Sequence, residues 1–327
     1  MATVLKPEWS KPGTILFAAE IPVNEKAFSY ALAQAVEHNA ALILFHAGEL
    51  HFAAAPSLGG LDGGFGGELE YINPTVMERA EAHALDPLAR RARAAGVHCR
   101  VLVRPGPAAD QILQVAREKS ADRIVMGTHA PGPIGKLLIG SVAESVLRRS
   151  PVPVCVVGPQ AVEHKAVSGV SHSVLCAVSR MESGGLVTAF AAEVAARSHA
   201  GLIVQHVIRP QDCAGPLMEE CFGEIEGKLL ALVPTRLRQK VHPEPFVVPG
   251  EPSEEVLYLS RKRHADLIVM GAHGASAFAA IARQGVVYKV MAHAPCPVMT
   301  LSPAVLEAAG NKSVVSEPAE SYMAGII

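Results

Sequence analysis

Short apolar runs alternate with longer amphipathic stretches along most of the chain. The first apolar run is Ile15–Ala19, and Asn24 then precedes a stretch with Phe28, Leu32 and Val36 at helical spacing. The same alternation returns several times before the chain ends. Buried strands that alternate with helices of about 10 to 15 residues are typical of βαβ units in a parallel sheet. The pattern therefore predicts an α/β fold with right-handed crossovers, which is a doubly wound, Rossmann-like sheet.

The second half of the chain repeats the first. The segment ADRIVMGTHAPGPIGKLLIGSVAESVLRRSPVPVCVV at 121–157 matches ADLIVMGAHGASAFAAIARQGVVYKVMAHAPCPVMTL at 265–301. The first apolar runs of the two halves also match, because ILFAAE at Ile15–Glu20 resembles VLCAVS at Val174–Ser179. The sequence thus predicts two copies of one domain, over residues 1–160 and 161–303. A tail at 304–327 follows, for which we expect a short helix or disorder.

Each copy contains five apolar runs that we interpret as strands. In the first copy they are Ile15–Ala19, Leu42–Phe45, Val97–Val103, Arg123–Met126 and Val152–Val157. In the second they are Val174–Val178, Leu202–Val204, Pro243–Val248, Leu267–Met270 and Val298–Leu301. The first copy has extra residues between its second and third strands, where a Gly-rich insertion of about 53–70 is expected to form a loop.

Composition narrows the class of protein. The 327 residues include 50% hydrophobic and 18% charged positions, with a formal net charge of −2, so neither disorder nor a nucleic-acid footprint is expected. The positive mean hydropathy of +0.26 raises the question of a membrane. The longest charge-free apolar run, Leu267–Ala282, is shorter than the roughly 20 residues that a spanning helix requires. No apolar leader is visible in Met1–Pro12, and the six cysteines form no C-x-x-C pair, so we expect a cytoplasmic protein with buried thiols.

Candidate chemistry lies where ligands bind in such sheets, beyond the carboxyl ends of the strands. The loop after the fourth strand is rich in small residues, which allow backbone N–H groups to approach a phosphate. Gly140 and Ser141 then begin the last helix, whose free N–H groups and dipole favour an anion, and Lys136 adds charge. Ser141 has an alternative role as a helix cap, and Gly127 as a turn residue.

At these residues the chain resembles the universal stress protein family and its G-x2-G-x9-G-[S/T] nucleotide motif, over residues 12–157 and 172–301. The resemblance implies five-stranded sheets of order 3-2-1-4-5 and dimerisation through the fifth strands, which here would form a pseudo-dimer within one chain. The resemblance also implies that ATP is the ligand, and that Mg²⁺ bound to the nucleotide is the only metal to expect. In such a site an acidic side chain lies on the adenine side, and the phosphates lie at the Gly-Ser start of the last helix. Carried over by position, the first-half nucleotide site is Glu20, Met126, Gly127, His129, Gly140, Ser141 and Val142.

Both copies depart from that motif. In the first, Ala130 replaces a glycine and Glu20 replaces an aspartate. In the second, Gln284 and Gly285 stand where Gly-Ser is expected, and Ser179 replaces the acid. We therefore expect conventional ATP binding to be lost in the second copy. Its weaker candidates are Met270, Gly271, His273 and Gly274.

The chain shows no nucleophile elbow, Walker lysine motif or H-E-x-x-H sequence. His46 and His51 have no partner constellation for a metal site. The first hypothesis is a nucleotide-linked stress or signalling protein that is at most slowly hydrolytic. The second is a structural or partner-binding module with decayed ligand sites. An enzyme of a related nucleotide-hydrolase fold would need a catalytic site elsewhere. We expect no nucleic acid or membrane among the partners, while a homodimer and an unknown protein partner stay open.

Overall fold

The computed structural model describes residues 11–48, 74–128, 140–162, 173–179, 181–209, 218–272 and 285–313. The Gly-rich insertion predicted at 53–70 lies outside them.

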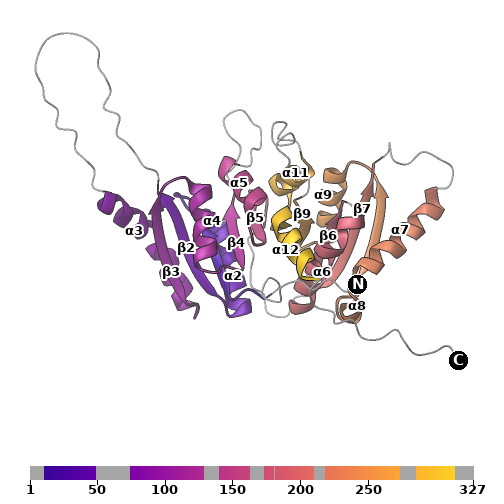
Figure 1. Cartoon of the computed structure of the whole chain (residues 1–327), viewed down its shortest axis with the longest axis horizontal. Helices are drawn as coiled ribbons and strands as arrows, with labels where there is room; N and C mark the ends of the chain where they lie inside the picture. Colours follow the sequence, from indigo (N-terminus) through magenta and orange to yellow (C-terminus); the bar gives the residue numbers. More distant parts are fainter. Residues whose placement is uncertain are drawn as a thin grey trace, which may run out of the picture.

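A single sheet of ten strands runs through both halves of the molecule, in the order β3-β2-β1-β4-β5-β10-β9-β6-β7-β8 (Figure 1). The first half supplies β1 (Thr14–Ala18), β2 (Ala41–Gly48), β3 (Cys99–Pro105), β4 (Arg123–Gly127) and β5 (Val154–Val157). The second half supplies β6 (Ser173–Val178), β7 (Gly201–Ile208), β8 (Glu244–Pro249), β9 (Leu267–Gly271) and β10 (Val298–Leu301). Strands within each half pair in parallel, in the order 3-2-1-4-5 that the resemblance implied.

The expectation of two separate five-stranded sheets is wrong. β5 and β10 pair antiparallel, with Val298 opposite Val156 and Met299 opposite Cys155. The side chain of Ser302 adds a bond to the carbonyl oxygen of Ser150, at 2.6 Å. An apolar edge strand with unpaired backbone groups is a site of association, so the predicted pairing of the two fifth strands merges both sheets into one.

Helices cover both faces of this sheet. In the first half they are α2 (Glu25–His38), α3 (Pro74–Ala94), α4 (Ala108–Glu118) and α5 (Ser141–Arg149). In the second half they are α6 (Met181–Arg197), α7 (Met218–Leu232), α8 (Thr235–Val241), α9 (Pro252–Lys262), α11 (Val286–His293) and α12 (Pro303–Ser313). The α3 and α7 helices lie at the two outer flanks of the molecule (Figure 1).

Two apolar cores lie on opposite faces of the sheet, as the period of two along a strand requires. Ile15 and Phe17 of β1 belong to the core beneath α2 and α6, whereas Leu16 belongs to the core beneath α4, α5, α9 and α11. Strands buried on both faces account for the high hydropathy of the chain. Among the described residues, no helix has the length and apolar character needed to cross a membrane.

Several local predictions are confirmed, with shifts at the element ends. Asn24 caps α2, because its side-chain oxygen accepts the N–H of Ala27 at 3.1 Å. A helix follows β10, with Val305 buried against the core, and residues 314–327 of the predicted tail lie outside the described part. The third strand begins at Cys99 and not at Val97, because the turn containing Gly96, with φ of 81°, occupies the preceding residues.

Candidate functional site

Each half has a cavity at the carboxyl ends of its strands, where the crossovers of β1 and β4, or of β6 and β9, diverge. The first cavity measures about 480 Å³. It is lined by Ala18 at the end of β1 and Ala19, Glu20 and Ile21 after it, Phe45, His46 and Ala47 of β2, Glu81 of α3, Ala108 and Ile112 of α4, Met126 of β4 and Val142 of α5. Glu20, Met126 and Val142, which the sequence proposed as one site, therefore lie around one cavity.

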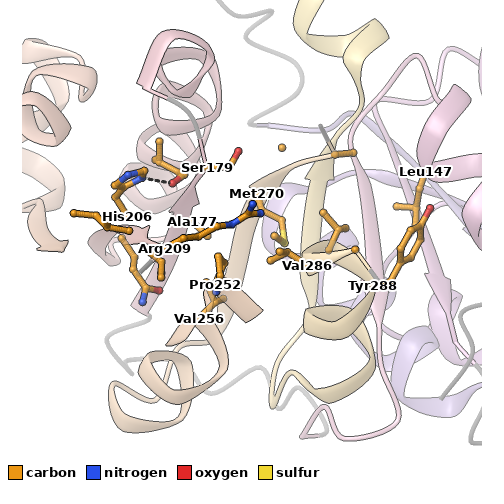
Figure 2. Close-up of a pocket in the computed structure, with 18 residues that line it drawn as sticks. Leu147, Ala177, Ser179, His206, Arg209, Pro252, Val256, Met270, Val286 and Tyr288 are labelled. Atoms are coloured by element: carbon orange, nitrogen blue, oxygen red, sulfur yellow. Dashed lines mark hydrogen bonds between the residues drawn. The ribbon is translucent and has the colours of Figure 1, made fainter. Parts of the chain in front are cut away.

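The second cavity, shown in Figure 2, is larger, at about 720 Å³. It repeats the first almost position by position: Ser179 takes the place of Glu20, Gln205 that of Phe45, His206 that of His46, Met270 that of Met126 and Val286 that of Val142. Gly271 also lines it. Leu147 of α5 lies beside Tyr288 on the side of the cavity opposite His206 (Figure 2), so the first half contributes to the wall of the second site.

A histidine at the end of the second strand recurs in both cavities. His46 Nδ1 lies 2.8 Å from the carbonyl oxygen of Ala19, and His206 Nδ1 lies 2.8 Å from that of Val178. A carbonyl oxygen only accepts, so each Nδ1 donates to it, and in the neutral tautomer with the proton on Nδ1 the Nε2 atom is an acceptor. Sequence reasoning did not place these histidines in the site. The recurrence of AALILFHA as AGLIVQHV is the signal that could have identified them.

The two cavities differ in charge. Glu20 and Glu81 line the first, and Glu81 Oε1 lies 4.0 Å from His46 Nε2. The second is lined by Arg209, and within the described ranges no Asp or Glu side chain lines it. Duplication has thus preserved the location and the histidine, while the first site has become acidic and the second basic.

The α5 helix begins without a side-chain cap. Gly140 occupies the N-cap position with φ of −59°, and no side chain caps the helix. Ser141 is the first helical residue, so its alternative role as the cap is wrong. A Cβ atom on Gly140 would meet nothing within 4 Å. Among the described residues, no side chain accepts the first-turn N–H groups of α5. Neither Gly140 nor Ser141 is among the residues that line the first cavity.

The second half keeps a glycine at the same structural position. Gly285 is the N-cap of α11, again without a side-chain cap bond. Alignment from the C-terminal ends of the helices places Gly285 opposite Ser141, so α11 begins one residue later than α5. The substitution at Gln284 is therefore not a substitution of the helix cap itself.

The remaining predicted site residues either lie away from the two cavities or fall outside the described part of the chain. Gly127 ends β4 and packs against Asn24 without lining the first cavity. His129 of the first half and His273 and Gly274 of the second half lie outside the described residues. No cluster of three or more potential metal ligands occurs in the part of the chain that the structure describes.

The buried cysteines carry no reactive character. Cys99, Cys155, Cys176 and Cys296 are free and buried. Burial raises the pKa of Cys155 to about 12, with opposing effects from its Tyr30 hydrogen bond and from Arg123. Burial likewise raises the pKa of Cys176 to about 12. A thiol with such a pKa stays protonated near neutral pH and is a poor nucleophile.

The chain is similar in sequence to universal stress proteins. The sequence profile of the universal stress protein family matches residues 13–158 and 171–302. A universal stress protein of Mycolicibacterium smegmatis is 29% identical over 192 residues, which cover 57% of this chain and 63% of that protein. One from Methanocaldococcus jannaschii is 35% identical over 91 residues, covering 28% of this chain and 53% of the relative. These two alignments thus span only part of each relative's length.

A solved structure extends the likeness over nearly the whole fold. The crystal structure of a universal stress protein from Archaeoglobus fulgidus covers 90% of this chain and 97% of its own, with a TM-score of 0.66 and 20% sequence identity. At that identity the likeness concerns the fold alone.

Proposed function

The chain belongs to the universal stress protein family, and we propose that it is a ligand-binding protein of a stress or signalling response whose first half binds ATP. The observation that carries this proposal is the shared cavity of Glu20, Met126 and Val142. These residues come from three separate parts of the chain, and the resemblance assigns them to the two ends of a nucleotide. A cavity of about 480 Å³ is within the usual range for small-molecule sites.

Charge sets the orientation of the nucleotide in this proposal. The carboxylate of Glu20 and the Nε2 atom of His46 are hydrogen-bond acceptors, which suit the amino group of adenine or the hydroxyl groups of ribose. Glu20 and Glu81 would repel phosphates. The phosphates therefore lie toward Gly140 and the start of α5, where the helix dipole favours anions. Mg²⁺ enters with the nucleotide, as a counterion to its phosphates.

Calorimetric titration of the full chain with Mg-ATP tests this arrangement. The decisive variant is Gly140→Gln, because a Cβ atom at Gly140 meets nothing within 4 Å and the longer side chain is placed at the start of α5. We expect the wild type to release binding heat and the variant to lose it at unchanged Tm. Gly201→Gln is the matched control, since Gly201 is also unobstructed but begins β7 at the opposite end of the sheet. Absence of heat from the wild type, or binding that survives Gly140→Gln, contradicts the proposal.

A second candidate is a partner-binding module with a decayed ligand site. Its support is the side chain of Asn24, which fills the space beside Gly127 that the nucleotide motif leaves open. The acidic lining of the first cavity also supports this candidate, because carboxylates repel the phosphates of a nucleotide. The two candidates separate in the same titration, because a decayed site binds no ATP in either the wild type or the control variant.

We further propose that the protein is not an enzyme beyond slow ATP hydrolysis at most, which a phosphate-release assay on the full chain measures. The β5–β10 pairing supports an internal pseudo-dimer in place of a dimer of two chains. Light scattering distinguishes a monomeric pseudo-dimer from a further homodimer. The free, buried cysteines agree with a cytoplasmic location.

A further inference from the structure

Gln205 is an anomaly in the wall of the second cavity. It lies on β7 with only 1% of its surface exposed, and within the described part of the chain neither its Oε1 nor its Nε2 atom has a hydrogen-bond partner. The equivalent position in the first half is Phe45, which is fully buried and apolar. The two halves thus share a backbone position at which one side chain packs as a hydrophobic residue and the other keeps two unused polar atoms.

An unpartnered amide in a protein interior destabilises the fold, because it has given up its hydrogen bonds to water and gained none in return. Such a group is expected where something else completes its bonds. Gln205 lines a cavity of about 720 Å³, but its amide atoms are buried, so a molecule in the cavity reaches them after a rotation of the Gln205 side chain. Hydrogen bonding by a ligand therefore accounts for an amide at a position where apolar packing suffices in the other half.

We propose that the second cavity binds a small planar molecule that presents an amide edge, with an N–H donor beside a C=O acceptor, to the side chain of Gln205. The Nε2 group of Gln205 donates to the ligand oxygen, and its Oε1 atom accepts from the ligand nitrogen. A ligand with a carboxylate in place of the amide can accept only from Nε2. Its second oxygen would then face Oε1, which is also an acceptor, and the two oxygens would repel each other. Carboxamides and the lactam edges of nucleobases share the required chemistry.

The rest of the cavity suits such a molecule. Val256, Met270 and Val286 provide apolar surface on which a planar ring can pack. Ser179, His206 and Arg209 lie at its polar side (Figure 2), where they can bond to groups carried by the ring. Few convergent polar groups among apolar walls are characteristic of small-molecule sites. This site is separate from the ATP site proposed for the first half, so either assignment can fail alone.

Ligand-observed NMR titration of the full chain with nicotinamide, nicotinate and uridine tests the proposal. Nicotinamide and nicotinate share a ring, but nicotinate carries a negatively charged carboxylate in place of the amide. Because Arg209 would favour the anion, weaker binding of nicotinate reports on the amide, and uridine presents the same edge as part of a nucleoside. We expect nicotinamide, uridine or both to bind in the millimolar range, and nicotinate to bind at least tenfold more weakly. Binding of uridine alone assigns the edge to a nucleobase, and binding of nicotinamide alone assigns it to a free carboxamide.

Gln205→Met removes both polar atoms at nearly constant volume and should abolish that binding without lowering Tm. Thr188→Val is the matched control, because Thr188 is equally buried in this half and does not line the cavity. Equal affinity for nicotinate and nicotinamide in the wild type overturns the proposal without reliance on any variant. Unchanged binding to Gln205→Met, or binding of neither amide probe, overturns it as well.

Discussion

The side chain of Asn24 fills the space beside Gly127, so that a Cβ atom on Gly127 would lie only 2.5 Å from Asn24 Nδ2. Asn24 is held there by two roles. Its side-chain oxygen caps α2, and its Nδ2 group donates to the carbonyl oxygen of Thr128 at 3.4 Å. The glycine that ends β4 is therefore required by the packing of α2 on the sheet, whatever the cavity binds.

Gly127→Ala should lower the free energy of unfolding by about 1–3 kcal/mol, the usual cost of overpacking a buried position. Urea denaturation of the wild type and the variant measures this loss. Gly201→Ala is the control, because Gly201 begins β7 and its Cβ atom meets nothing within 4 Å, and it should stay within about 0.5 kcal/mol of the wild type. In an Asn24→Ala background the cost of Gly127→Ala should shrink, and equal costs in the two backgrounds would show that Asn24 is not the obstacle.

Ser302 joins the two halves through its side chain. Its hydroxyl donates to the carbonyl oxygen of Ser150 at 2.6 Å and accepts the N–H of Val305 at 3.1 Å, at the start of α12. Ser302→Ala leaves both buried partners without this oxygen, so we expect a loss of about 1–3 kcal/mol in urea denaturation. Ser145→Ala removes only an exposed contact with Arg149 and serves as the control. A Ser302 variant as stable as that control would contradict the role.

The thiols should be inert in the folded protein. Burial raises the pKa values of Cys155 and Cys176 to about 12, so both stay protonated and shielded at pH 8. We expect iodoacetamide to modify them only after urea unfolds the chain, as followed by peptide mass spectrometry. Rapid modification of either residue in native buffer would show that its segment opens locally.

His38 should make the fold sensitive to mild acid. Burial lowers its pKa from 6.5 to about 4, and the positive charge of Arg123 contributes in the same direction. The unfolded chain therefore binds a proton on this residue at a higher pH than the folded chain does. This contribution to stability is complete above about pH 6.5 and is lost progressively as the pH falls toward 4. Urea midpoints at pH 7 and pH 5 measure the loss.

His38→Gln removes this titration, so its midpoint should fall less between the two pH values than that of the wild type. Both chains keep the same carboxylates, so their shared acid sensitivity cancels in the comparison. Parallel falls in the two chains would assign the acid sensitivity to other groups.

The repeat and the cap at Asn24 are recoverable from the sequence because they are local or duplicated features, whereas the strand order within each half followed from the resemblance to the universal stress protein family. Apolar periodicity identifies each element, and short right-handed crossovers leave few ways to arrange such elements in a sheet. The gathering of Glu20 and Met126 at one cavity follows from the same rule, since both stand at the carboxyl ends of neighbouring strands.

The character of the two sites was decided by tertiary structure. Their differences arise from the packing of residues far apart in the chain. Asn24 lies beside Gly127, Glu81 faces His46, and Gln205 is buried with no hydrogen-bond partner among the described residues. The sequence pointed to the first half as the better ligand site, whereas the fold gives the second half the larger and less acidic cavity. Local patterns determine which elements form, but packing between distant elements determines which space remains empty and which polar atoms line it.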